Sequence, residues 1–472
     1  MISLSLETLG CKLNQLESEA IAESFTRSGF SLVPWGAPAD ILVVNTCTVT
    51  SKAEQKARRI IRKALRDNPA SCIIVTGCYA QLDGSALAAL EGALTGTSPV
   101  PGTGRLFVVS GDRKAALLDL PRYLPEAPEL LPAALSRWQD RDAPRTKALE
   151  PFAFMPEDFS FHSRAFLKIQ DGCDHACAYC RVSLARGRSV SLAAETVLER
   201  LRALEDRGYA EAVLTGVNIN QYAGTAQGAL QQRADLGGLL ALLLRGTSRI
   251  ALRLSSLEPE GITPEFLSAL EDTRIRPHFH LSIQSGSNRV LEKMRRWYTQ
   301  ADIEAAVEKL RAHKGDPFLA CDIITGFPGE TDGEFDKTYA LCERIGFSWI
   351  HAFPYSRRPG TEAYAFPQTV SEGEAAARVE ALLTLARQGR AAYIRRWLGK
   401  TVAVIPLSGG ADLPGYTAGI TENYLKVLIH PSVATPPPGR TLECVLCPNP
   451  ESALPASAFS GGNRYDAIAN LK

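Results

Sequence analysis

Short apolar runs alternate with helical stretches twice along this chain, and this alternation constrains its fold more than any other feature. The first set of expected strands comprises Ile2–Glu7, Ile41–Val44, Ile73–Val75 and Leu106–Val109. Strands that alternate with helices form parallel sheets, because each helix carries the chain back to the same edge. We therefore predict an N-terminal doubly wound parallel α/β domain over residues 1–120.

The second set of alternations fills residues 159–396. Its expected strands are Phe166–Ile169, Glu211–Leu214, Ile250–Leu254, His278–Ile283, Phe318–Ile324 and Trp349–Phe353. Six parallel strands with outer helices indicate a partial (β/α)6 barrel, whose chemistry is expected at the carboxyl ends of the strands. A long amphipathic helix, Ser371–Arg396, ends this domain.

Two further segments lack this alternation. Residues 121–158 hold seven prolines without a sustained period, which predicts a proline-rich linker that wraps a surface. Residues 397–472 carry short β-branched runs broken by proline and glycine, such as Thr401–Ile405 and Tyr424–Ile429. Such runs indicate a small all-β barrel. The complete prediction is an α/β protein with a C-terminal β-barrel.

Composition excludes several classes of protein. Lys plus Arg total 52 and Asp plus Glu total 51, so a net charge of +1 excludes a uniformly basic nucleic-acid coat protein. Met1–Glu7 has no basic flank, and no apolar run approaches the roughly 18 residues of a membrane span. We therefore expect a cytoplasmic protein with no membrane partner. Eleven cysteines, an odd number, favour reduced thiolates that bind a metal or cluster over disulfides.

Cys173, Cys177 and Cys180, here called the loop triad, directly follow the first expected barrel strand in Cys-Asp-His-Ala-Cys-Ala-Tyr-Cys. Three soft thiolates so close together can converge on one iron–sulfur or zinc centre. A structural zinc site takes a fourth ligand, whereas three ligands on a four-iron cluster leave one iron open to a cofactor. The open cluster is favoured, and the alternatives are a zinc site with a distant fourth ligand and three core cysteines.

Cys11, Cys47 and Cys78, here called the N-terminal triad, each follow an expected parallel strand. Because the carboxyl ends of parallel strands meet at one edge of a sheet, these thiolates are predicted to be neighbours. Gly10 and Gly77 would allow the backbone to approach a bulky ligand closely. A second open cluster is favoured over three unrelated loop cysteines.

These motifs resemble those of the radical S-adenosylmethionine methylthiotransferases over nearly the whole chain. The matching segments are Gly10–Gln15, Asn45–Thr50, Gly77–Ala80, Arg186–Ser191, Leu214–Asn218, Leu281–Ser287, Asp322–Glu330, Phe353–Ser356 and Arg358–Thr361. Ser183 is the main departure, since the family usually has proline there, and it removes no cysteine. The resemblance implies a radical-SAM barrel in the centre of the chain and a C-terminal TRAM domain.

The resemblance also implies two 4Fe–4S clusters and S-adenosylmethionine as cofactors. The N-terminal triad would hold the first cluster and the loop triad the radical cluster, with all six cysteines taking part in catalysis. In the family, one S-adenosylmethionine methylates a sulfur on the first cluster, and a second is cleaved at the radical cluster to methionine and a 5′-deoxyadenosyl radical. The radical removes hydrogen from C2 of adenine, and a methylthio group replaces it.

The loops around the N-terminal triad are most similar to one branch of this family. Thr8–Gln15, Asn45–Thr50 and Lys52–Gln55 resemble the branch that modifies N6-threonylcarbamoyladenosine at position 37, 3′ of the tRNA anticodon. The expected partners are the tRNA anticodon loop and an electron donor of the flavodoxin or ferredoxin type; the sulfur donor is not indicated. The alternatives are the same chemistry on N6-isopentenyladenosine in tRNA or on a ribosomal-protein aspartate, and a non-catalytic iron–sulfur RNA-binding protein.

Candidate contacts to S-adenosylmethionine lie where the expected barrel strands end. They are Gly216, Asn218, Ser255, Glu258 and Gln284. Tyr179, beside the last cysteine of the loop triad, would pack against the adenine of the cofactor. Each of these residues could instead have a structural role in the barrel or its core.

Candidate contacts to RNA come from two segments. The expected helix after Cys47 carries a basic stripe at intervals of four, three, four and three residues, namely Lys52, Lys56, Arg59, Lys63 and Arg66. This stripe is either a track for phosphates, with Lys56, Arg59 and Lys63 as contacts, or a solvated charged face. TRAM domains bind RNA in this family, so Tyr424 and Lys426 are candidates there, with barrel core or edge as the alternative.

The other five cysteines are expected to have structural roles. Cys72, Cys321 and Cys342 lie in apolar patterns typical of a core. Cys444 and Cys447 form a lone Cys-x-x-Cys in the C-terminal segment, for which packing is favoured over a redox or zinc role.

Overall fold

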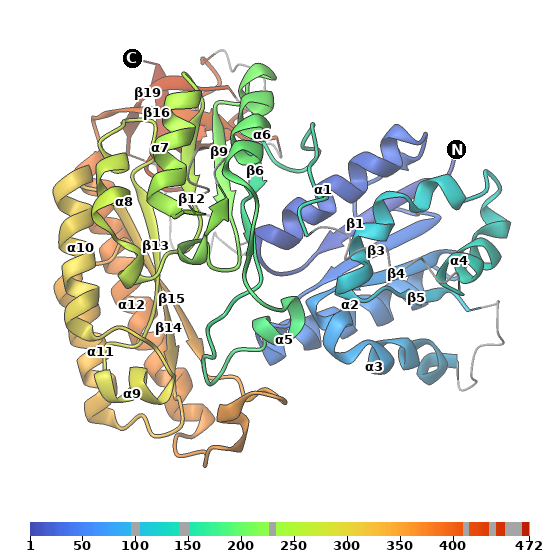
Figure 1. Ribbon diagram of the computed structural model, residues 1–472, viewed down its shortest axis with the longest axis horizontal. Helices are drawn as coiled ribbons and strands as arrows, with labels where there is room; N and C mark the ends of the chain where they lie inside the picture. Colours follow the sequence, from blue (N-terminus) through green and yellow to red (C-terminus); the bar gives the residue numbers. More distant parts are fainter. Residues whose placement is uncertain are drawn as a thin grey trace. The chain divides into compact units, whose positions relative to one another are not determined.

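A computed structural model describes residues 1–95, 104–140, 151–225, 233–408, 415–433, 440–448 and 465–471 (Figure 1). The chain divides into two compact units. The first comprises Met1–Ser160, Gln170–Val190 and Ser356–Thr361, and the second comprises Phe161–Ile169, Ser191–Tyr355 and Glu362–Lys472. The loop triad therefore belongs to the same unit as the N-terminal triad. None of the described helices is both long and apolar enough to cross a membrane.

The first unit is built on a five-stranded parallel sheet with the order β2-β1-β3-β4-β5. Its strands are β1 (Ser3–Thr8), β2 (Ser31–Leu32), β3 (Ile41–Thr46), β4 (Cys72–Gly77) and β5 (Leu106–Val108). The crossover helices are α1 (Lys12–Arg27), α2 (Ser51–Asp67) and α3 (Cys78–Thr95). The four predicted strands are confirmed. The two-residue strand β2 was too short to leave a pattern in the sequence.

Alternate residues of the strands enter two apolar cores, one on each face of this sheet. Val43 and Ile74 pack with Phe25 of α1 in one core. Val44 and Ile73 pack with apolar residues of α2 and α3 in the other. Because β3 and β4 are covered on both faces, all of their residues are buried rather than alternating with exposed ones. The prediction of a doubly wound sheet is confirmed.

The prediction of a surface linker over residues 121–158 differs from the structure. Residues 141–150 lie outside the described residues, but α4 (Leu131–Asp140) places Leu135 and Trp138 in the same core as α1. The prolines did not prevent this, because Pro128 and Pro132 lie in the first turn of η3 (Pro128–Leu130) and α4. Backbone N–H groups in the first turn of a helix make no intrahelical hydrogen bond, so proline, which lacks this group, is tolerated there.

The second unit holds six parallel strands in two groups with the orders β12-β9-β6 and β13-β14-β15. They are β6 (Ala165–Lys168), β9 (Glu211–Thr215), β12 (Ala251–Leu254), β13 (His278–Gln284), β14 (Phe318–Thr325) and β15 (Trp349–Pro354). The amide of Leu257, just after β12, donates to the carbonyl of His280 at 2.8 Å and bridges the two groups. All six predicted strands are confirmed within two residues.

Helices cover the outer side of these strands (Figure 1). They are α6 (Ala194–Asp206), α7 (Leu236–Gly246), α8 (Pro264–Leu270), α9 (Asn288–Lys293), α10 (Gln300–Lys314), α11 (Asp332–Ile345) and α12 (Glu372–Trp397). The predicted long helix is α12, which begins at a capping box formed by Ser371 and Glu374. Cys321 and Cys342 are fully buried between strand and helix, as Cys72 is in the first unit. The predicted core roles of these cysteines are confirmed.

The second unit ends in a closed five-stranded barrel with the order β16-β17-β18-β20-β19. Its strands are β16 (Thr401–Pro406), β17 (Thr417–Thr421), β18 (Lys426–Ile429), β19 (Leu442–Cys447) and β20 (Ala467–Leu471). The barrel core is continuous with Phe318 of β14 and Tyr393 of α12 and contains the buried Cys444. The predicted small all-β barrel is confirmed, and the exact domain boundaries stay predictions.

Candidate functional site

The structure brings the N-terminal triad together at the carboxyl edge of the five-stranded sheet. Cys11 precedes α1, Cys47 follows β3, and Cys78 opens α3. Burial raises the pKa of the Cys47 thiol to about 12, and the charges of Cys11 and Cys78 also raise it. Desolvation raises the pKa of Cys11 as well, and the neighbouring Cys78 adds to this rise. The thiols therefore share one electrostatic site, as expected from the parallel topology.

Two glycines make this close approach possible. Gly10 has a φ of +101°, and a Cβ on it would lie 2.7 Å from the sulfur of Cys47. Gly77 has a φ of +103°, and its Cβ would lie 2.3 Å from the carbonyl oxygen of Thr46. Side chains at either position would be strained in the backbone and would collide with the neighbouring loop. The glycines are thus required for the loops of the triad to converge.

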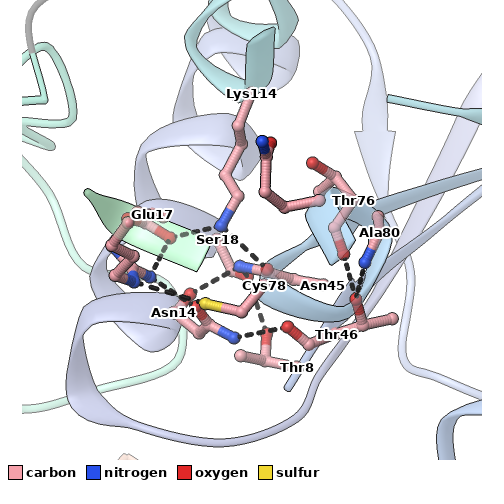
Figure 2. A network of polar contacts seen from close by, with 12 residues as sticks. Thr8, Asn14, Glu17, Ser18, Asn45, Thr46, Thr76, Cys78, Ala80 and Lys114 are labelled. Carbon is pink, nitrogen blue, oxygen red and sulfur yellow. Dashed lines mark hydrogen bonds and ion pairs between the residues drawn. The ribbon is translucent and has the colours of Figure 1, made fainter. Parts of the chain in front are cut away.

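A network of buried polar side chains holds these loops in register (Figure 2). The Asn14 amide donates to the carbonyls of Leu9 at 2.8 Å and Thr46 at 3.0 Å. The Asn45 amide donates to the carbonyl of Asn14 at 2.9 Å and to Ser18 Oγ at 3.1 Å. These contacts join the loop after β1 and the first turns of α1 to the carboxyl end of β3. Backbone groups that the strands leave unpaired are satisfied in this way.

A buried ion pair lies beside the same loops. Lys114 Nζ is 2.5 Å from Glu17 Oε2 and donates to Asn45 Oδ1 at 3.1 Å. Both charged side chains are less than 5% exposed. In Figure 2, Lys114 extends toward Glu17 and Asn45 from one side of the site. The pair places a fixed cation and a fixed anion next to the triad.

The loop triad lies between β7 (Gln170–Asp171) and α5 (Val182–Arg186), and its three cysteines are partly buried. Gly172 has a φ of +68°, and a Cβ there would lie 2.0 Å from the carbonyl oxygen of Arg188. The amide of Cys173 donates to the carbonyl of Gly187 at 3.1 Å, and the amide of Val182 donates to Cys180 Sγ at 3.4 Å. The loop therefore closes on itself and presents three thiols from one short segment.

The candidate cofactor contacts in the second unit follow the ends of β9, β12 and β13. The Asn218 amide donates to Glu258 Oε2 at 2.8 Å, so the structure brings these two side chains together. Ser255 Oγ is buried and has no hydrogen-bond partner among the described residues. Gln284, at a register shift of β13, has a φ of +61°. A buried unpartnered hydroxyl and a strained backbone are features that ligand sites often hold.

Comparison with known proteins now defines the family. The Radical SAM superfamily matches residues 167–342, and the Uncharacterized protein family UPF0004 matches residues 3–96. The threonylcarbamoyladenosine tRNA methylthiotransferase MtaB of Treponema pallidum (strain Nichols) is 41% identical, over 91% of this chain and 95% of that protein. The chain belongs to the radical S-adenosylmethionine methylthiotransferase family.

Two other relatives of this methylthiotransferase differ in the base that their names state. MtaB of Bacillus subtilis (strain 168) is 34% identical, over 91% of this chain and 90% of that protein. The tRNA-2-methylthio-N(6)-dimethylallyladenosine synthase of Nitratidesulfovibrio vulgaris (strain DP4) is 34% identical, over 87% of each chain.

The cofactors of this methylthiotransferase are S-adenosylmethionine and 4Fe–4S clusters. The residues present fit them. None of the eleven cysteines, all of which lie among the described residues, forms a disulfide, and each triad offers three soft thiolates, the ligand type that iron–sulfur clusters take. Gly10 and Gly77 let the segments of the N-terminal triad approach one another, and the Ser255 hydroxyl, which has no hydrogen-bond partner among the described residues, suits a polar ligand.

The basic stripe of this methylthiotransferase lies on the exposed face of α2. Lys52, Lys56 and Arg59 are exposed, whereas Ala57 and Ile61 on the opposite face are buried. Farther along the helix, Lys63 and Arg66 lie 3.3 Å and 3.2 Å from the carboxylate of Asp67. The stripe is therefore accessible, and both a phosphate track and a solvated face are compatible with this placement.

The two candidate RNA contacts of the C-terminal barrel differ in their surroundings. The ring of Tyr424 stacks on that of His278 with centroids 3.9 Å apart, and the guanidinium carbon of Arg253 lies 5.2 Å from its centroid. Tyr424 therefore packs the barrel against β12 and β13. Lys426 is exposed at the start of β18. Tyr179, in the loop of the first unit, is partly buried.

Sequence reasoning missed several charged residues of the site. Glu17, Lys114 and Arg186 are buried beside the N-terminal triad. Arg181 directly follows the loop triad and pairs with Glu54 of α2 at 3.2 Å. A buried charge leaves no periodic pattern in the sequence. Arg181 and Arg186, within a few residues of Cys180, could still have indicated that charged side chains lie beside the cysteines.

Proposed function

We propose that this methylthiotransferase converts N6-threonylcarbamoyladenosine at position 37 of tRNA to its 2-methylthio derivative. The observation that carries the proposal is the 41% identity, over 91% of the chain, to a protein named for that substrate. The relative named for dimethylallyladenosine is 34% identical over 87% of the chain and makes N6-isopentenyladenosine in tRNA the second candidate. Both candidates share the same replacement of the C2 hydrogen of adenine by a methylthio group.

We assign the two cysteine triads to two clusters. Cys11, Cys47 and Cys78 would hold the first 4Fe–4S cluster, and Cys173, Cys177 and Cys180 would hold the radical cluster. Support comes from the absence of disulfide bonds at these six described cysteines and from their membership of one compact unit. When bound, the radical cluster supplies reductive cleavage of S-adenosylmethionine to methionine and a 5′-deoxyadenosyl radical.

The proposed contacts to S-adenosylmethionine are polar groups at the strand ends of the second unit. The Glu258 carboxylate is held by Arg296 at 2.6 Å and by Asn218, so it presents a fixed anionic acceptor to ribose hydroxyls. Ser255 supplies the unpartnered hydroxyl. Gly216 and Gln284 are proposed to contact the cofactor through backbone groups at the same edge. Tyr179 is proposed to pack against its adenine.

The proposed contacts to tRNA are Lys56, Arg59 and Lys63 of α2 and Lys426 of the C-terminal barrel. All four are exposed lysines or arginines, which bind phosphates through charge. The stack of Tyr424 on His278 supports the barrel from which Lys426 projects. A modified base in a stacked anticodon loop must leave the stack to react. We place the reaction in the cytoplasm with an electron donor of the flavodoxin or ferredoxin type.

The proposal is tested with enzyme purified without oxygen, after iron and sulfide have been quantified. The enzyme is incubated with dithionite, S-adenosylmethionine and threonylcarbamoylated or isopentenylated tRNA, and the digested nucleosides are analysed by mass spectrometry. We expect a new methylthio nucleoside from the threonylcarbamoylated tRNA. Product from the isopentenylated tRNA alone would overturn the substrate assignment and favour the second candidate.

Single variants separate the two clusters. Cys11→Ala should lose about half of the iron and all nucleoside product but keep 5′-deoxyadenosine formation. Cys177→Ala should lose 5′-deoxyadenosine formation itself. Cys447→Ala, which removes a partly buried cysteine of the C-terminal barrel, is the matched control and should keep both activities. Full iron content in Cys11→Ala would overturn the assignment of the first cluster.

A further inference from the structure

Arg186, at the end of α5, reaches from the loop that carries the loop triad to the N-terminal triad. Its Nε donates to Cys78 Sγ at 3.3 Å. Its terminal nitrogens donate to Glu17 at 2.9 Å, to Asp171 at 3.2 Å and to Asn14 Oδ1 at 2.9 Å. The side chain is 9% exposed. Figure 2 shows Asn14, Glu17 and Cys78 grouped at this point. One guanidinium thus joins the segments that carry both triads.

The charges around this guanidinium are balanced. Glu17 and Asp171 are the two carboxylates that it contacts, and Lys114 is the other cation, 2.5 Å from Glu17. Loss of the Arg186 charge would leave two carboxylates and one ammonium group beside the cysteines. Because these four charged side chains are at most 10% exposed, this change in net charge would be only weakly screened by solvent. Arg186 therefore controls the local potential at the N-terminal triad.

We infer that Arg186 is a positioning residue that orients Cys78 and raises the reduction potential of the cluster held by the N-terminal triad. The inference rests on the proposed ligation of that cluster by Cys11, Cys47 and Cys78. A hydrogen bond to a ligand sulfur and a nearby positive charge both stabilise the more negative, reduced form of a cluster. Arg186 supplies both from one side chain.

Two other arginines of the same loop lack the contact to sulfur and make matched controls. Arg181 is also buried, at 8% exposed, and pairs with Glu54 and Asp83 at 3.2 Å. It anchors the loop, and among the described residues it makes no contact with a thiol. Arg188 is 87% exposed and pairs with Asp174 at 2.5 Å. Comparison of variants at the three arginines separates three effects: anchoring of the loop (Arg181), an exposed positive charge (Arg188) and direct contact with Cys78 (Arg186).

The test uses the full chain with Cys173, Cys177 and Cys180 replaced by alanine, so that one cluster remains. Iron and sulfide are measured first, because a protein without any cluster would contradict the proposed ligation rather than the role of Arg186. The reduction potential is then measured by titration followed by electron paramagnetic resonance. We expect Arg186→Gln to shift the reduction equilibrium at least tenfold toward the oxidised form, which is 59 mV for one electron.

Arg181→Gln and Arg188→Gln should leave the potential unchanged, and Arg186→Lys should give an intermediate value. Lysine keeps the positive charge but lacks the rigid fork of donors that guanidinium offers. An unchanged potential in Arg186→Gln, or an equal shift in Arg181→Gln, would overturn the inference. If Arg186→Gln loses the cluster, Arg186→Lys decides: a potential below that of the parent supports the inference, and one equal to the parent overturns it.

Discussion

At the scale of single residues, two glycines with similar backbone conformations have different surroundings. Gly77 is the last residue of β4, has a φ of +103° and faces the backbone of Thr46. Gly29 follows α1 with a φ of +88°, and an added Cβ there would have no atom within 4 Å. Alanine at either position is strained by roughly 1 kcal/mol, because the left-handed region disfavours a Cβ. Only at Gly77 is a collision with neighbouring backbone added.

Gly77→Ala should therefore displace the loop that carries Cys78 and prevent assembly of the first cluster. We expect the purified variant to lose about half of its iron. Gly29→Ala should keep its full iron content and lose only about 1 kcal/mol of stability. Iron quantification and thermal unfolding of both variants check this prediction. Full iron in Gly77→Ala would show that the loop tolerates the displacement.

Glu211 of β9 is the other residue whose surroundings give a sharp expectation. It is fully buried and receives hydrogen bonds from Arg253 at 2.6 Å, Arg276 at 3.1 Å and Arg164 at 3.2 Å. Burial alone would raise the pKa of Glu211, but the charges of these arginines lower it from 4.5 to about 2. The group stabilises the fold above pH 4.5, and this contribution is lost as the pH falls toward 2.

Glu211→Gln should destabilise the second unit by about 3 kcal/mol at pH 7, because it leaves buried arginines without a counter-charge. The difference in unfolding free energy between the parent and the variant should narrow below pH 4.5, because the carboxylate of the unfolded parent begins to take up protons there while the folded carboxylate, with a pKa of about 2, stays ionised. Glu380→Gln, which breaks an exposed pair with Arg387, should cost less than about 1 kcal/mol. Urea unfolding between pH 3 and pH 7 measures the stability of both variants and of the parent. A difference in unfolding free energy between the parent and Glu211→Gln that does not change with pH would contradict the role assigned to the Glu211 charge.

At the scale of elements, the strands were predictable because each is an apolar run that ends in a polar or glycine-containing loop. The six strands of the second unit and four of the first follow this pattern. Helix α4 was not predicted, because its prolines and short length conceal the spacing of Leu131, Leu135 and Trp138. The stack of Tyr424 on His278 was not predictable either, since it joins a turn of the C-terminal barrel to a strand 146 residues away in sequence.

Helix α2 carries the electrostatic prediction at this scale. Its exposed lysines and arginines project from one face, and the net charge of the chain is only +1. If α2 follows a phosphate backbone, replacement of Lys56, Arg59 and Lys63 by alanine should weaken tRNA binding at least tenfold. The slope of log affinity against log salt should fall by roughly one per lost phosphate contact. Filter binding at several salt concentrations measures both quantities.

A matched control removes the same charge from other helices. Arg289 of α9, Lys309 of α10 and Arg395 of α12 are also exposed. Their joint replacement by alanine should leave the salt slope unchanged. Equal losses in the two triple variants would mean that net charge rather than α2 governs binding, and the stripe would then be a solvated face.

At the scale of the whole molecule, the parallel topology made the N-terminal triad predictable, whereas its charged neighbours required the folded structure. Arg186 and Glu17 are 169 residues apart, and Arg358 donates to the carbonyl of Thr48 across 310 residues. No local pattern contains such pairs. The sequence likewise did not reveal that Gln170–Val190 belongs to the compact unit of residues 1–160.

The two apolar cores of the first unit lead to a prediction about removal of the clusters. These cores pack helices on both faces of the sheet, whereas the six proposed ligands lie at the carboxyl edge of the sheet or between β7 and α5. Small metal domains unfold without metal because they lack such a core. Here the chain should stay folded when iron is chelated, although its melting temperature should fall, since binding to the native state alone stabilises it.

Far-ultraviolet circular dichroism of chelated and mock-treated enzyme checks this expectation. We expect superimposable spectra at 25 °C, a lower melting temperature for the chelated sample, and recovery after reconstitution with iron and sulfide. The melting temperature of Cys11→Ala should lie between those two samples, because it would keep the radical cluster. A loss of helical signal on chelation would show that the clusters, rather than the cores around Phe25 and Ile61, hold the first unit together.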